Sequence, residues 1–187
     1  QRHLSEKNCR DLIEALQSIP EAITSVLKSE DTIRDLVKRH IHRQNWLYLG
    51  RGVNFPVALE GALKLKELSY IHAEGMPAAE MKHGPLALID RGMPVVVVAP
   101  RDSTTDKVMV NIEEVRSRGG HVIAVSTVGD NDLSSVADDI IHVPHVPPPL
   151  SPLVTTIPLQ LMAYHAALIR GHDVDRPRNL AKSVTVE

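Results

Sequence analysis

The sequence contains a single cysteine, Cys9, in 187 residues. One cysteine excludes a disulfide within the chain and is typical of a reducing compartment, so we expect a cytoplasmic protein. Cys9 lies in a polar stretch with no histidine pattern beside it, and we interpret it as incidental rather than as a nucleophile.

The sequence also has few aromatic residues and no large excess of charge of either sign. Phe, Trp and Tyr together make up 3% of the chain, so its core must be built from aliphatic side chains and methionine. The formal net charge of −2 leaves no basic surface of the kind that binds nucleic acid. No uninterrupted apolar run approaches the roughly 18 residues of a membrane span, and no signal peptide opens the sequence. We therefore expect neither a nucleic-acid partner nor membrane insertion.

The composition is that of an ordinary globular domain, 43% hydrophobic and 24% charged. Apolar β-branched segments predict strands, and helical periodicity predicts helices between them. The predicted strands include residues 46–49, 94–100, 121–125 and 140–143, and the predicted helices are residues 56–72, 105–118 and 151–170. Strands that alternate with helices are typical of a parallel sheet covered on both faces. We expect an α/β three-layer sandwich of flavodoxin-like type, with a five-stranded, mostly parallel sheet and residues 95–99 at its centre.

The pattern divides the chain into three parts. Residues 1–40 show tandem helical periodicity, which predicts short helices that form a connector or arm. Residues 41–171 contain the alternating strands and helices. Residues 172–187 form a polar tail without periodicity.

The helix predicted over residues 56–72 carries the most informative pattern. Glu60, Lys64 and Glu67 follow one another at spacings of four and three residues, which puts them on one narrow face. Apolar and small residues surround them, whereas a solvated helix face is normally wider and more charged. Two interpretations stay open: the wall of a cleft in which pKa values shift, or a ladder of ion pairs that stabilises the helix.

Two further residues are candidates for chemistry. His83 precedes Gly84 and Pro85 at a loop edge, where a histidine can move protons near neutral pH or simply cap a helix. Lys182 lies near the end of the sequence, a position at which lysines are normally solvated. Its neighbours are apolar, so a tail folded over the cleft would desolvate the ammonium and make it an amine nucleophile toward a carbonyl.

Cofactor and metal sites are not indicated. Gly50 and Gly52 form only a fragment of a dinucleotide-binding fingerprint, with Phe55 in the place of its third glycine. No Ser or Thr in that loop supplements the backbone amides for an anion. No spacing of His, Cys, Asp and Glu matches a metal site, and we interpret the histidines at positions 72, 121, 142 and 165 as structural. We expect no cofactor and no metal.

Taken together, several segments resemble a known family. Residues 49–52, 58–67, 70–74 and 82–90 are similar to the second sugar-isomerase (SIS) domain of the glucosamine-6-phosphate synthase family. Residues 175–187 closely match the C-terminal tail of that family. The resemblance begins at about residue 46 and is less distinct over the first 40 residues. It implies an SIS fold and a part in making glucosamine 6-phosphate from fructose 6-phosphate and glutamine.

The resemblance also implies roles for the candidate residues. Lys182 corresponds to the lysine that forms a Schiff base with the open-chain keto sugar, and Ala181 beside it is implied to bind substrate. Glu67 corresponds to the base that moves a proton between C1 and C2 of the sugar. Lys64 corresponds to a lysine of the same helix face that positions groups or transfers protons.

By the same resemblance, His83 is the histidine that opens the sugar ring, supported by Glu60. In this family the histidine loop reaches the site of the partner subunit, so a homodimer is implied. The sequence departs from the family in the loop that delivers His83, because residues 76–79 (MPAA) stand where a glycine usually precedes position 80. Pro77 fixes its φ angle and so constrains the path of this loop.

Other parts of the family have no counterpart in this sequence. A glutaminase domain and a first SIS domain with a Ser/Thr-rich phosphate loop are missing, so we expect part of a longer enzyme that is inactive alone. One alternative is a stand-alone SIS phosphosugar isomerase or deglycase. The other is a regulatory module that binds a phosphosugar without turnover, which would be expected to lack part of the set Glu60, Glu67 and Lys182.

Overall fold

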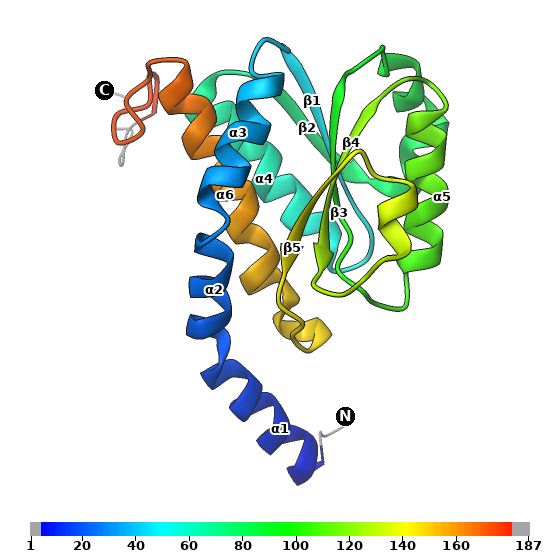
Figure 1. The fold of residues 1–187 in the computed structure, drawn as a ribbon, viewed down its shortest axis with the longest axis vertical. Coiled ribbons are helices and arrows are strands. Elements are labelled where there is room, and N and C mark those ends of the chain that lie inside the picture. The colour runs from blue at the N-terminus through cyan, green and yellow to red at the C-terminus, as the bar shows by residue number, and fades with distance from the viewer. Residues whose placement is uncertain (1–4, 181–187) are drawn as a thin grey trace, which may run out of the picture.

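The computed structural model describes residues 5–180, in which a parallel sheet lies between two layers of helices (Figure 1). The five strands are β1 (Asn45–Gly50), β2 (His72–Pro77), β3 (Pro94–Val98), β4 (His121–Thr127) and β5 (Asp139–Val143). Their spatial order is β2-β1-β3-β4-β5, and every neighbouring pair is parallel. This is the flavodoxin-like order, and it confirms the predicted fold class.

The helices form two layers of unequal size. The larger layer contains α2 (Ile19–Leu27), α3 (Glu30–His40), α4 (Asn54–Ser69) and α6 (Ser151–Ile169). The opposite face is covered by α5 (Thr105–Arg116) and by the 3₁₀ turns η1 (Ala78–His83) and η2 (Pro85–Leu88). Two more 3₁₀ turns, η3 (Asp132–Ser135) and η4 (Pro148–Leu150), lie in the connections around β5. The first helix, α1 (Glu6–Gln17), extends away from the body of the domain (Figure 1).

The central strand β3 is buried on both faces, as the sequence predicts. Val96 and Val98 pack in the core under α4 and α6, whereas Val95 and Val97 pack in the core under α5. All four side chains are fully buried. Because side chains alternate across a strand, a run of β-branched residues can serve two cores at once.

The edge strand β2 is the element that the sequence did not locate. A helix was predicted as far as residue 72, but α4 ends at Ser69 and Tyr70 adopts a left-handed conformation with φ 59°. Residues 72–77 (HAEGMP) pair along the whole length of β1. Ala, Glu, Gly and Pro have low strand propensity, so this strand depends on its pairing rather than on its own sequence.

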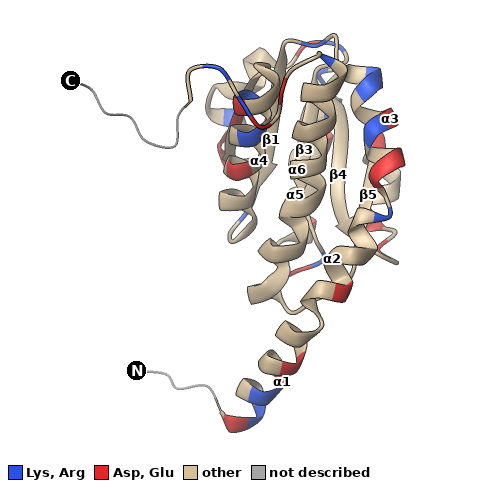
Figure 2. Cartoon of the chain, turned by 90° about the vertical axis from the view of Figure 1, so that its left-hand side faces the viewer, with Lys and Arg blue, Asp and Glu red and all other residues tan. Residues whose placement is uncertain are grey.

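Helix α6 is long and apolar enough to resemble a membrane-spanning helix. By length and composition alone the segment Pro148–Ile169 could cross a membrane, although half of it is buried inside the protein. The helix carries no Lys, Arg, Asp or Glu (Figure 2) and packs against α2, α3 and α4. A helix that is apolar on most sides is expected where several neighbours cover it, so its composition follows from its place in the core.

Gly50 brings the end of β1 into close contact with the start of α4. A Cβ atom at this position would lie 2.1 Å from the backbone oxygen of Asn54, whereas at Gly52, with φ +56°, it would meet nothing within 4 Å. We expect Gly50→Ala to lower the free energy of unfolding by about 2–3 kcal/mol, because backbone must move. Gly52→Ala should cost about 1 kcal/mol from its φ angle alone. Urea denaturation compares the two, and equal losses would contradict the steric explanation.

Candidate functional site

The candidate site begins with three charged side chains on α4. Lys64 lies between two carboxylates, with its Nζ atom 2.8 Å from Oε2 of Glu67 and 3.8 Å from Oε1 of Glu60. The three side chains are between 27% and 40% exposed. The structure therefore brings together the residues that the helical spacing placed on one face, at the boundary between core and solvent.

The ion pair between Lys64 and Glu67 determines the charge of the lysine and which oxygen of the glutamate stays free. The hydrogen bond to Glu67 is the main cause that raises the pKa of Lys64, and the negative charges of both glutamates act in the same direction. Lys64 is therefore a protonated ammonium at neutral pH. It engages only Oε2 of Glu67, and within residues 5–180 no hydrogen bond to Oε1 is formed. A carboxylate fixed through one oxygen, with the other oxygen open, can accept a proton from a bound substrate.

Glu67 also lines a cavity of about 550 Å³ at the C-terminal end of α4. Lys66, Tyr70 and the chain around Arg178 contribute to the same wall. This volume falls within the range of small-molecule binding sites. Glu60 and Lys64 do not line the cavity, so only one member of the charged cluster faces it directly.

The start of the tail is attached to the end of α4 by Tyr70. The backbone N–H of Arg178 donates a hydrogen bond to the Tyr70 hydroxyl at 2.8 Å. The Arg178 guanidinium lies 4.0 Å from the centre of the Tyr70 ring, and His172 packs against the same ring at 4.6 Å. The contacts with Arg178 join residues 108 positions apart, and no local sequence pattern could have indicated them.

Two predicted site residues, Ala181 and Lys182, lie outside the described residues. The structure follows the chain as far as Leu180, which still lines the cavity next to Glu67.

His83 occupies a different part of the molecule from the charged cluster on α4. It is the last residue of η1, it is exposed, and Gly84 follows it with φ 141°. η1 packs against α5, on the face of the sheet opposite to α4, and its Met81 belongs to that core. Among the described residues, no hydrogen bond or ion pair links His83 to Glu60, Lys64 or Glu67. Within one chain His83 therefore lies apart from the charged cluster on α4.

The loop after β1 does not offer an anion site. At the N-terminus of α4 the buried Asn54 donates from Nδ2 to Oδ2 of Asp102 at 3.1 Å. Asp102 follows β3, so its carboxylate lies near the helix end at which a phosphate would otherwise be favoured. A carboxylate in this place repels a second anion, which agrees with the absence of Ser and Thr from the loop.

Comparison with known proteins identifies the fold and the relatives of this chain. Residues 41–170 match the family model of the SIS domain. The chain is 54% identical over 186 residues to a glutamine–fructose-6-phosphate aminotransferase (isomerising) of Chlorobaculum tepidum, covering 100% of this chain and 30% of that protein. A protein of the same name from Bacteroides thetaiotaomicron is 55% identical over 184 residues, covering 98% and 30%. The chain thus spans about 30% of the length of the curated relatives that it matches.

Solved structures give the same result. The C-terminal domain of a glucosamine-fructose-6-phosphate aminotransferase from Francisella tularensis superposes with a TM-score of 0.87 at 38% identity, covering 92% of this chain and 49% of that one. A tagatose-6-phosphate ketose/aldose isomerase from Escherichia coli superposes with a TM-score of 0.74 at 22% identity, covering 84% and 45%. The second likeness concerns the fold alone.

Proposed function

This chain belongs to the SIS domain family, and from that premise we propose that it forms the C-terminal isomerase part of a glutamine–fructose-6-phosphate aminotransferase (isomerising). The observation that carries the proposal is identity above 50% along the whole chain to two proteins of that name. The whole enzyme would make glucosamine 6-phosphate from fructose 6-phosphate and glutamine. The part described here would carry out the ketose-to-aldose conversion.

Glu67 and Lys182 would carry the chemistry of this conversion. The Lys182 amine adds to the C2 carbonyl of the open-chain sugar and forms a Schiff base with loss of water. Ammonia then replaces the lysine amine at C2, which frees Lys182 and leaves an imine on the sugar. The open oxygen of Glu67 takes the proton from C1 and returns it to C2, so that C1 becomes the aldehyde carbon, and the position of Glu67 in the cavity wall is suited to this transfer. Lys64 holds Glu67 through the other oxygen, and the same hydrogen bond raises the pKa of Lys64 and keeps the ammonium charged. Ala181 would contact the substrate beside the reacting lysine.

His83 would act in the site of a second copy of the chain. Ring opening needs an acid and base at the sugar ring, a role that suits an exposed histidine at the end of a short turn. Because η1 lies on the face opposite to α4, a homodimer offers a way to bring His83 to the partner's Glu60. We therefore propose a homodimer in which His83 and Glu60 of different subunits cooperate.

The remaining parts of the chain have supporting roles in this proposal. Residues 1–40 would connect the domain to preceding parts of the enzyme, and residues 172–187 would close over the cavity from their attachment at Tyr70. A glutaminase and a first SIS domain would supply ammonia and hold the sugar phosphate. The single cysteine and the proposed phosphorylated substrate support a cytoplasmic location for this reaction. A stand-alone isomerase or a regulatory module is not favoured, because the high identity is to aminotransferases.

The test compares the chain with the longer protein that contains it. We expect the longer protein to make glucosamine 6-phosphate from fructose 6-phosphate and glutamine. The 187-residue chain alone should make none, because it lacks the ammonia source and the binding energy that positions the phosphate. No synthesis by the longer protein would overturn the proposed function, and synthesis by the isolated chain would overturn the proposed division of labour.

A further inference from the structure

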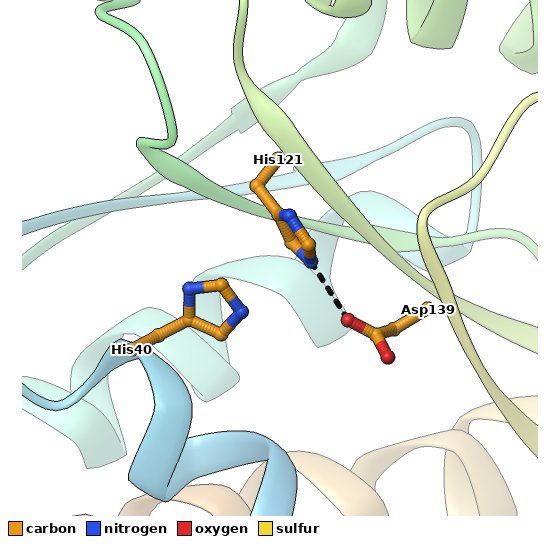
Figure 3. Close-up of side chains that lie close together, drawn as sticks. All are labelled: His40, His121 and Asp139. Atoms are coloured by element: carbon orange, nitrogen blue, oxygen red, sulfur yellow. Dashed lines mark hydrogen bonds and ion pairs between the residues drawn. The ribbon is translucent and has the colours of Figure 1, made fainter.

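Two histidines and an aspartate converge at the edge of the sheet away from the site described above. His40 is the last residue of α3, His121 is the first residue of β4, and Asp139 is the first residue of β5. One potential ligand atom from each lies within 4.8 Å of the other two. Figure 3 shows the three side chains pointing toward one another, with the His40 ring facing the His121–Asp139 pair.

Part of this cluster is already held in place by hydrogen bonds. Nε2 of His121 lies 2.7 Å from Oδ2 of Asp139, and Arg39 pairs with the other carboxylate oxygen, Oδ1. A metal-ligating carboxylate is commonly fixed by such a partner on its second oxygen. Oδ2 of Asp139 and Nε2 of His121 are therefore bonded to each other, and a cation that binds both atoms would replace this hydrogen bond.

His40 provides an independent observation, because its imidazole is buried without a partner. Its side chain is 8% exposed, and Nε2 forms no hydrogen bond with any described residue. An unpaired buried polar atom is costly, and a buried atom of this kind usually has a ligand, a water or an ion as its partner.

We propose that His40, His121 and Asp139 bind a divalent transition-metal ion of the Zn²⁺ class. Two imidazoles and one carboxylate are ligands that zinc accepts at about 2.0–2.2 Å, with a water in the fourth position. Coordination through Nε2 of His121 would leave the ring proton on Nδ1. The positive charge of Arg39 weakens the attraction of the cation, and the carboxylate of Asp139 opposes this effect.

The bound ion would join the helical arm to the sheet. His40 ends α3, and the two other ligands begin two neighbouring strands, so one ion would link α3 to two strands that lie far from it in sequence. Sequence spacing predicted no metal site and left His121 as structural, because only ligands that are close in the chain give a recognisable pattern. The three residues lie at the ends of α3, β4 and β5, and none of them lines the cavity that contains Glu67, so the proposal is independent of the proposed enzymatic function.

The test uses the 187-residue chain without a histidine tag, stripped of metal by a chelator and titrated with ZnCl₂ in a calorimeter. We expect one Zn²⁺ per chain for the wild type. His121→Gln and Asp139→Asn should weaken binding by at least about 10-fold, because each removes a direct ligand. Both positions are only partly buried, so these variants are expected to fold, which circular dichroism verifies.

His142→Gln is the matched control, because His142 is an exposed histidine on the same strand as Asp139. It should bind zinc like the wild type, and zinc should raise the melting temperature of both proteins but not that of Asp139→Asn. No binding by the wild type, or equal affinity in the wild type, His121→Gln and Asp139→Asn, would overturn the proposal.

Discussion

Replacing Glu67 by Gln in the complete enzyme is expected to lower sugar isomerisation by about 10²–10⁴-fold, which is the usual contribution of a general base. The amide oxygen of Gln can still accept the hydrogen bond from Lys64, so the local geometry is retained. What is lost is the negative charge that accepts the proton from the sugar. Glutamine hydrolysis should continue, because it takes place in another domain of the proposed enzyme.

The matched control for this substitution is Glu113→Gln. Glu113 is an exposed residue of α5, on the other side of the sheet from α4. This variant loses the same charge and should isomerise at the wild-type rate. Steady-state assays of sugar product and of glutamate, made in parallel, separate the two activities. If Glu67→Gln isomerised at nearly the wild-type rate, the charges on α4 would be a stabilising ion-pair ladder and not a catalytic site.

The sequence predicted the elements that depend on burial better than those that depend on pairing. β3 and β4 are rich in apolar β-branched residues. Such segments are typical of strands in the middle of a parallel sheet, where both faces are buried. β2 has no such pattern, because an edge strand that contains Gly75 and Pro77 is specified by its partner β1. The end of α4 was also predicted wrongly. Tyr70 ends this helix by adopting a left-handed conformation, and tyrosine rarely adopts it, so the residue type gave no indication of the helix end.

In the candidate site, too, the sequence predicted the local arrangement and missed the contacts between distant positions. The cluster on α4 is local, and the spacing of its residues follows directly from 3.6 residues per turn. The contact between Tyr70 and Arg178, and the convergence of His40 with Asp139, both join positions about 100 residues apart. Only the three-dimensional path of the chain brings these side chains together. No single-sequence pattern records that path.

Replacing Lys182 by Arg is expected to abolish covalent trapping of the sugar by borohydride and to reduce synthesis to background. Arginine keeps the positive charge, but a guanidinium does not lose its proton in proteins and cannot serve as the amine of a Schiff base. Incubation with fructose 6-phosphate and borohydride, followed by mass spectrometry of the intact protein, measures the trapped adduct. The attachment of Arg178 at Tyr70 starts the tail beside the cavity that Glu67 lines, which is where the proposed mechanism requires this amine.

Two other lysines, Lys64 and Lys66 on α4, are alternative candidates for the reacting amine, and the experiment distinguishes them from Lys182. Lys66 lines the same cavity and is exposed, so Lys66→Arg is the matched control and should retain both trapping and synthesis. Lys64 is a poor nucleophile, because its hydrogen bond to Glu67 raises its pKa and keeps the amine protonated. Loss of the adduct in Lys182→Arg alone would identify the reacting amine. An adduct that persists in Lys182→Arg and disappears in Lys66→Arg would move the Schiff base to α4 and contradict the role proposed for the tail.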